Sequence, residues 1–128
     1  MRPASFVSVR GVLLFSLVAE GATAVAVILA PSLVARLLFD LDLAGAGVAV
    51  GRLLGVTLLA LVIACSPDAA APGGTRAALR AMFVYNALAG AYLAYLGVAH
   101  RPMGILLWPA VAEHMLVAAL LATGTRRT

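Results

Sequence analysis

Four long apolar stretches, separated by shorter polar connections, dominate the pattern of the chain. A helix that crosses a membrane needs about 20 mostly apolar residues, because each residue advances about 1.5 Å across about 30 Å of hydrocarbon. Four stretches have this length, and each is interrupted by very few polar residues. The pattern therefore predicts four membrane-crossing helices, at about Gly11–Ala30, Ala46–Cys65, Ala81–Ala99 and Pro102–Ala122.

The connection Pro31–Gly45 has a pattern of its own. Its leucine and valine residues recur at helical spacing, while Arg36 and Asp40 mark the opposite face. Pro31 suits the first turn of a helix, and Arg36 and Asp40 stand four residues apart, which permits an ion pair. We expect a short helix in the membrane interface, either a connection packed over the bundle or a lid over a polar cavity. The connection Ser66–Arg80 contains Pro-Asp and Pro-Gly-Gly, which predict a flexible loop.

Composition supports the membrane assignment. The 128 residues are 64% hydrophobic and 11% charged, and the mean hydropathy is +1.10. A soluble domain carries about 25% charged residues, so a water-facing surface cannot be built here and lipid must cover most of the exterior. The expected fold is all-α: an integral membrane four-helix bundle that forms a single domain over residues 1–128.

The arginines predict the orientation in the membrane. Cytoplasmic loops carry an excess of basic residues. Arg36 and Arg101 flank one side of the predicted spans, and six arginines flank the other. That second side is expected to be cytoplasmic, with both termini there, in the inner (plasma) membrane of a bacterium. Because the arginines are scattered and do not form a basic face, the net charge of +4 does not indicate a nucleic-acid partner. The six arginines are Arg2, Arg10, Arg76, Arg80, Arg126 and Arg127.

Each predicted span carries polar residues that lipid should exclude. They are Glu20, Arg52, Asn86 and the pair Glu113 and His114, and helix rise places them about 9–19 Å from the outer helix ends. A charge at mid-bilayer costs at least about 2.5–3.5 kcal/mol, so such groups turn inward and pair. Arg52 is the only fixed cation within the spans and faces two acids. We therefore expect this midplane cluster to carry a surplus negative charge and to hold a proton near neutral pH.

The midplane cluster has two interpretations. It forms a binding or proton site, or its polar groups only hold the helices together, as polar side chains do in membrane bundles. Glu113 and His114 are adjacent and therefore point about 100° apart around the helix. His114 is accordingly expected to reach a second helix interface or another subunit.

Other residues near the cluster predict packing. Pro109 cannot donate a backbone hydrogen bond, so it should bend the fourth helix and leave the carbonyl of Ile105 free. Glycines spaced four apart make a smooth stripe for close helix contact, either within the chain or between subunits. This stripe consists of Gly47, Gly51 and Gly55. Two aromatic residues are candidates for the lining of a cavity beside the cluster, Tyr85 and Trp108.

The signature of an enzyme is weak: only Glu113 and His114 would serve as a general acid–base pair, on a lipid-soluble substrate. The single cysteine, Cys65, excludes an internal disulfide and a multi-cysteine metal site. Motifs such as HExxH, a phosphate-binding glycine loop and a nucleophile elbow are missing from the sequence, so neither a metal nor a cofactor is expected.

Three classes of function follow. The first is a non-catalytic component or assembly subunit, whose partners are membrane lipids and either further copies or another membrane protein. The second is a small transporter or channel that uses the midplane cluster as a protonatable binding site and therefore depends on Glu20 or Glu113. The third is an enzyme for a lipid-soluble substrate, which requires an apolar cavity that opens beside His114 and holds an isoprenoid or acyl tail.

Three stretches carry a resemblance to a known group. They are Pro31-Ser-Leu-Val-Ala-Arg-Leu-Leu-Phe, Gly51-Arg-Leu-Leu-Gly-Val-Thr-Leu-Leu-Ala-Leu and Leu106-Leu-Trp-Pro-Ala-Val-Ala-Glu-His. In their order along the chain, they resemble uncharacterised bacterial four-helix membrane proteins of the DoxX-like kind and a similar family of unknown function. The resemblance implies the four-helix fold and says little about activity.

Overall fold

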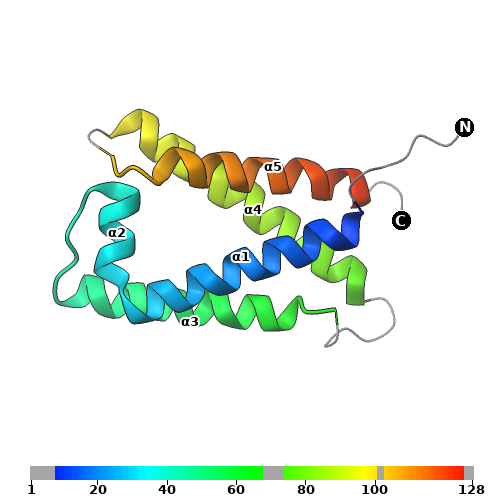
Figure 1. Cartoon of the computed structure of the whole chain (residues 1–128), viewed down its shortest axis with the longest axis horizontal. Coiled ribbons are helices and arrows are strands. Elements are labelled where there is room, and N and C mark those ends of the chain that lie inside the picture. The colour runs from blue at the N-terminus through cyan, green and yellow to red at the C-terminus, as the bar shows by residue number, and fades with distance from the viewer. Residues whose placement is uncertain (1–7, 68–73, 101–102, 126–128) are drawn as a thin grey trace, which may run out of the picture.

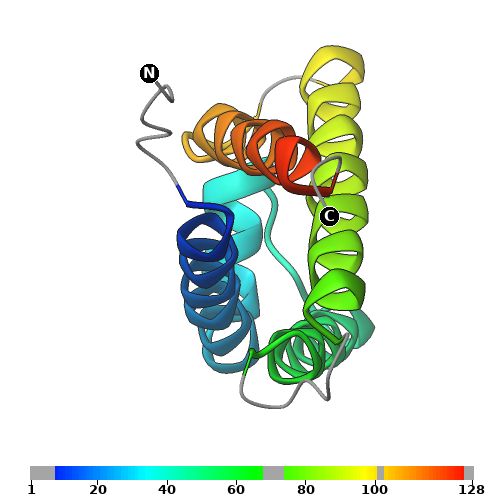
Figure 2. The same ribbon diagram turned by 90° about the vertical axis from the view of Figure 1, so that its right-hand side faces the viewer.

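The computed structural model describes residues 8–67, 74–100 and 103–125, and within these ranges every regular element is an α-helix. Three helices, α1, α3 and α4, are long and apolar enough to cross a membrane, whereas α5 is apolar but shorter. Seen from the end where α1 begins, the long helices surround the centre and α2 lies across the far end (Figures 1 and 2). The helices are α1 (Val9–Leu29), α2 (Pro31–Phe39), α3 (Ala46–Ala64), α4 (Gly74–Ala99) and α5 (Leu107–Thr125).

Glycines allow close contact within two pairs of helices, α1 with α3 and α4 with α5. A β-carbon at Gly55 of α3 would lie 2.9 Å from the carbonyl oxygen of Ala24 in α1, and one at Gly51 would lie 2.9 Å from Pro31. In α4, a β-carbon at Gly90 would lie 2.9 Å from the sulfur of Met115 in α5. The glycine stripe of α3 thus packs within the chain, while Gly47 at its outer end meets Leu43 at ordinary contact distance.

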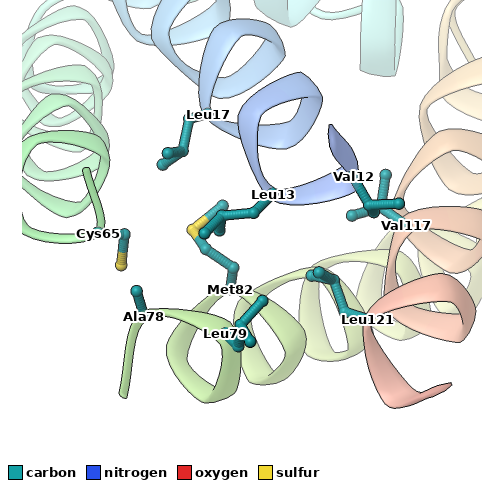
Figure 3. Packing of buried hydrophobic residues seen from close by; sticks show 9 residues of the cluster. All are labelled: Val12, Leu13, Leu17, Cys65, Ala78, Leu79, Met82, Val117 and Leu121. Atoms are coloured by element: carbon teal, nitrogen blue, oxygen red, sulfur yellow. The ribbon is translucent and has the colours of Figure 1, made fainter. Parts of the chain in front are cut away.

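The largest apolar core lies at the end of the bundle where α1 begins. Leu13 of α1, Met82 of α4 and Leu121 of α5 are each at most 1% exposed. Figure 3 shows their side chains meeting between the three helices. Leu13, Met82 and Leu121 with their buried neighbours are called the inner core below; the other members are Val12, Leu17, Cys65, Ala78, Leu79 and Val117.

The short helix predicted within Pro31–Gly45 is present as α2. Backbone hydrogen bonds hold its last turn to the segment before α5: the amide of Gly104 donates to the carbonyl of Leu38 (3.1 Å), and that of Leu106 donates to Leu37 (2.9 Å). These bonds satisfy carbonyls that a helix end leaves without partners. A side chain at Gly104 would fall on the carbonyl of Leu37, so only glycine allows this approach.

The ion pair predicted between Arg36 and Asp40 is wrong. Asp40 caps α2 in the left-handed conformation (φ 54°, ψ 37°), which turns the chain back along the helix. Arg36 consequently meets Asp42, with 3.1 Å between Nε and Oδ1. Both side chains are mostly exposed, so this pair stabilises the turn only weakly.

Two predicted boundaries are also corrected. The loop Ser66–Arg80 does not extend to residue 80, because α4 begins at Gly74 and buries Ala78 and Leu79 in the inner core. The fourth predicted span does not begin at Pro102, since α5 begins at Leu107. Pro109 is therefore the third residue of α5, where no intrahelical donor is required, and it helps to start the helix instead of bending it.

Candidate functional site

Three of the polar residues predicted for the midplane cluster meet in the structure. They come from three helices: Glu20 from α1, Asn86 from α4 and His114 from α5, with exposures of 2%, 0% and 8%. The Nδ1 atom of His114 lies 2.9 Å from Oδ1 of Asn86 and 3.4 Å from Oε1 of Glu20. His114 thus reaches two other helices of the same chain.

The hydrogen bonds of Asn86 determine which nitrogen of His114 carries the proton. The amide nitrogen of Asn86 donates to the carbonyl of Met82 (2.9 Å) and to the hydroxyl of Ser16 (3.2 Å). A carbonyl only accepts, so the amide oxygen of Asn86 must be the atom that faces His114. Nδ1 of His114 is then the donor, and in the neutral ring Nε2 keeps a free lone pair.

The two acids keep oxygen atoms without hydrogen-bond partners. The hydroxyl of Tyr85 donates to Oε2 of Glu20 (3.0 Å), and its ring lies edge-on to that of His114 at 5.7 Å. Oε1 of Glu20 and Oε1 of Glu113 are both buried, and neither has a hydrogen-bond partner among the described residues. A buried polar atom of this kind costs about 1–3 kcal/mol when it is left unsatisfied.

Arg52 does not join these acids, which corrects the expectation that it faces them. Its side chain is exposed on α3, and within the described part of the chain it forms no ion pair. One reason is its position along α3: Gly51 meets Pro31, whereas Val62 meets Gly21 beside Glu20, so Arg52 lies about 15 Å along the helix from the level of Glu20. The other is helix rotation, because Gly51 and Gly55 occupy the contact with α1 and α2 and Arg52 follows Gly51 by about 100° around the helix. The acids therefore face no fixed cation among the described residues.

A cavity of about 500 Å³ adjoins the acids and is called the chamber below. Glu20, Glu113 and His114 lie on its wall, and α2 contributes Val34 and Leu37 to the lining. Most of its lining is apolar, and its volume is within the range of about 300–1,000 Å³ that is typical of ligand sites. The twelve residues that line it are Glu20, Thr23, Ala26, Val34, Leu37, Leu38, Leu93, Leu106, Pro109, Ala110, Glu113 and His114.

The two aromatic candidates for the cavity lining lie elsewhere. Tyr85 sits behind Glu20 and is bonded to it, while Trp108 packs against Gly97 and is 49% exposed. The sequence pattern did not single out Ser16 or Thr23. Both stand about one helical turn from Glu20, at four and three residues, so the position of Glu20 itself was the signal that could have found them.

Neither metal chemistry nor a known family identifies this site. Among the described residues, no group of three or more His, Cys, Asp or Glu side chains could hold a metal ion. Comparisons with protein families, with curated proteins and with solved structures find no match for this chain. The function must therefore be argued from the chamber itself.

Proposed function

We propose that the protein crosses the inner membrane of a bacterium four times, with both termini in the cytoplasm. The end where α1 begins and α5 finishes also holds the start of α4 (Figure 1). Arg10, Arg76 and Arg80 belong to that end, whereas Arg36 lies in α2 at the other, as the excess of basic residues on the cytoplasmic side requires. At a rise of about 1.5 Å per residue, even α5 nearly spans the hydrocarbon layer.

Within that membrane, we propose that the protein is a non-catalytic component that binds a lipid-soluble amphiphile. The single observation that carries this proposal is the chamber, an apolar space with the carboxyl groups of Glu20 and Glu113 on its wall. An apolar tail would occupy the part below α2, and a polar head would meet the carboxyl groups. Membership of the DoxX-like group is compatible with this role and is likewise a proposal.

The size of the chamber argues for an occupant. Protein interiors are close-packed, with few voids larger than a water molecule, and the inner core of this chain is packed in that way. The chamber is far larger, and Thr23 and Ala26 on its α1 wall are exposed, so the space is half-open. A surrounding membrane offers alkyl chains to such an opening, and a molecule with a matching head would be held.

Native mass spectrometry of the purified protein with 1-aminodecane tests the proposal. We expect one saturable adduct per chain. Ala110→Phe, which places a ring in the chamber, should weaken the binding by about tenfold or more. Ala60→Phe on the exposed face of α3 is the matched control and should bind like the wild type. Non-saturable uptake, or equal binding by Ala110→Phe, would contradict a ligand site in the chamber.

A further inference from the structure

The chamber has a surplus of hydrogen-bond acceptors. Oε1 of Glu20 and Oε1 of Glu113 are buried and have no hydrogen-bond partner in the described part of the chain, and Nε2 of His114 keeps its lone pair in the neutral ring. All three residues line the chamber. A ligand that completes this wall must therefore bring donors.

Most of the donors that the described residues offer near the wall are already used. The single hydroxyl proton of Tyr85 points to Oε2 of Glu20, and the Nδ1 proton of His114 points to Asn86. The amide of Asn86 is committed to Ser16 and Met82. Thr23 is the remaining polar residue of the lining, and a hydroxyl carries only one proton. At least one of the two free carboxyl oxygens thus needs a donor that the described residues of the lining do not supply.

The charges around the chamber also favour a ligand that brings a positive charge. The titratable groups that face Glu20 are Tyr85 of α4 and Glu113 and His114 of α5. The wall supplied by α2 consists of Val34, Leu37 and Leu38. In the described part of the chain, the ionised acids therefore have no fixed positive partner, and in a low-dielectric site two such charges require protons or a cation.

We propose that the amphiphile is a lipophilic amine, held as its ammonium ion by the carboxylates of Glu20 and Glu113. This inference rests on the proposed function and names the class of its ligand. An alkylammonium brings one positive charge and three N–H donors on an apolar tail, and each property matches a part of the chamber. A bare metal ion would match only the charge, since most of the lining is apolar.

Protons and the amine compete for the same carboxyl groups. When an ammonium ion binds at a protonated carboxyl group, the O–H bond breaks, the proton passes to water and the carboxylate keeps the electron pair. Binding should therefore weaken as the pH falls, although the amine itself stays charged from about pH 5 to about pH 8. A neutral amphiphile displaces no proton and should bind without this pH dependence.

The test compares 1-aminodecane with 1-decanol, which has the same tail but no charge. Binding to the protein in nanodiscs of zwitterionic lipid is measured by native mass spectrometry at about pH 8 and about pH 5, with empty nanodiscs as the blank. We expect the amine to bind about tenfold more tightly than the alcohol at the higher pH and to lose most of this advantage at the lower. Glu20→Gln and Glu113→Gln should each remove the preference, whereas Arg52→Gln, on the exposed face of α3, should keep it.

The outcomes separate this inference from the proposed function. Equal binding of amine and alcohol, both blocked by Ala110→Phe, would overturn the amine and leave the chamber as a ligand site. The amine is also overturned if the two Gln variants fold, as judged by circular dichroism and a single elution peak, and keep the preference. Failure of both amphiphiles to give saturable binding would overturn the proposed function as well.

Discussion

The two halves of the bundle differ in how tightly their side chains are packed. In the inner half, where α1 begins, α1, α4 and α5 pack around Leu13, Met82 and Leu121. Each of these side chains is at most 1% exposed. In the outer half, at the opposite end of the bundle, α2 lies across the other helices (Figure 1), and the chamber beside it stays half-open. The acids lie along this transition. A rigid, filled half can hold polar groups in fixed positions, and an open half can admit a molecule to them.

A large-to-small substitution in the inner core should show the difference between the two halves most strongly. Leu13→Ala should lower the free energy of unfolding by about 2–5 kcal/mol, because a cavity remains among fixed neighbours. Leu93→Ala in the chamber lining should cost less than about 1 kcal/mol, since that side chain already borders empty space. Equilibrium unfolding in mixed micelles measures both, and equal losses would contradict the contrast between the halves.

The attachment of α2 is the next target. Gly104→Ala places a methyl group on the carbonyl of Leu37, which should separate α2 from the start of α5 at a cost of about 1–3 kcal/mol. Amide hydrogen exchange should then rise at Leu106 while Leu79 in the inner core keeps its protection. Gly47→Ala, which meets Leu43 at ordinary contact distance, is the control. Unchanged exchange at Leu106 would show that these bonds do not hold α2.

The shared level of Glu20, Asn86 and His114 along the bundle could be predicted from the sequence, but the level of Arg52 and the rotation of α3 could not. Helix rise alone places Glu20, Asn86 and His114 in one layer, and the structure brings these three together. Arg52 does not share that layer. Gly51 meets Pro31, whereas Val62 is the residue of α3 that meets Gly21 beside Glu20, so Arg52 lies about 15 Å along α3 from the level of Glu20. It also faces outward, because the close contacts at Gly51 and Gly55 set the rotation of α3. That choice depends on tertiary packing, which no pattern within one helix contains.

Helix ends were also hard to predict from the sequence. The proline and glycine residues of the connection before α4 predicted a loop as far as Arg80, but burial of Leu79 in the inner core extends the helix into it. The proline pattern before Glu113 predicted a bend, because the start of α5 was placed too early. An apolar cavity beside His114 was expected only for an enzyme, and the position of the chamber among α1, α2, α4 and α5 depends on how these helices pack.

A smaller effect is expected at the polar link between the halves. Asn86→Ala removes the acceptor of His114 and should cost about 1–2 kcal/mol. Nitrogen NMR of the ring at about pH 8 should show the Nδ1–H tautomer in the wild type and a mixture in the variant. Ser16→Ala, which spares the bond between Asn86 and His114, should keep the wild-type tautomer. A wild-type ring protonated at Nε2 would contradict the assignment.

The smallest effect is expected outside the bundle, at the ion pair of Arg36 and Asp42. The hydrogen bond from Arg36 and the charge of Asp42 raise the pKa of the guanidinium above its ordinary value. Both groups are so exposed that water and salt screen the pair. Arg36→Gln should therefore leave the unfolding midpoint and amine binding unchanged, and a marked loss of either would show that this turn supports the chamber.

Photolabelling with an aminodecane that carries a diazirine in its tail tests the central claim most directly. We predict that, after irradiation in nanodiscs, peptide mass spectrometry finds label on Val34, Leu37 and Leu93 of the chamber, and that excess 1-aminodecane removes it. Label on the exposed residues Leu53 and Leu54 of α3 reports simple partition into lipid and should survive the competitor. Label on α3 alone, or label in the chamber that no competitor removes, would contradict binding of the amine in the chamber.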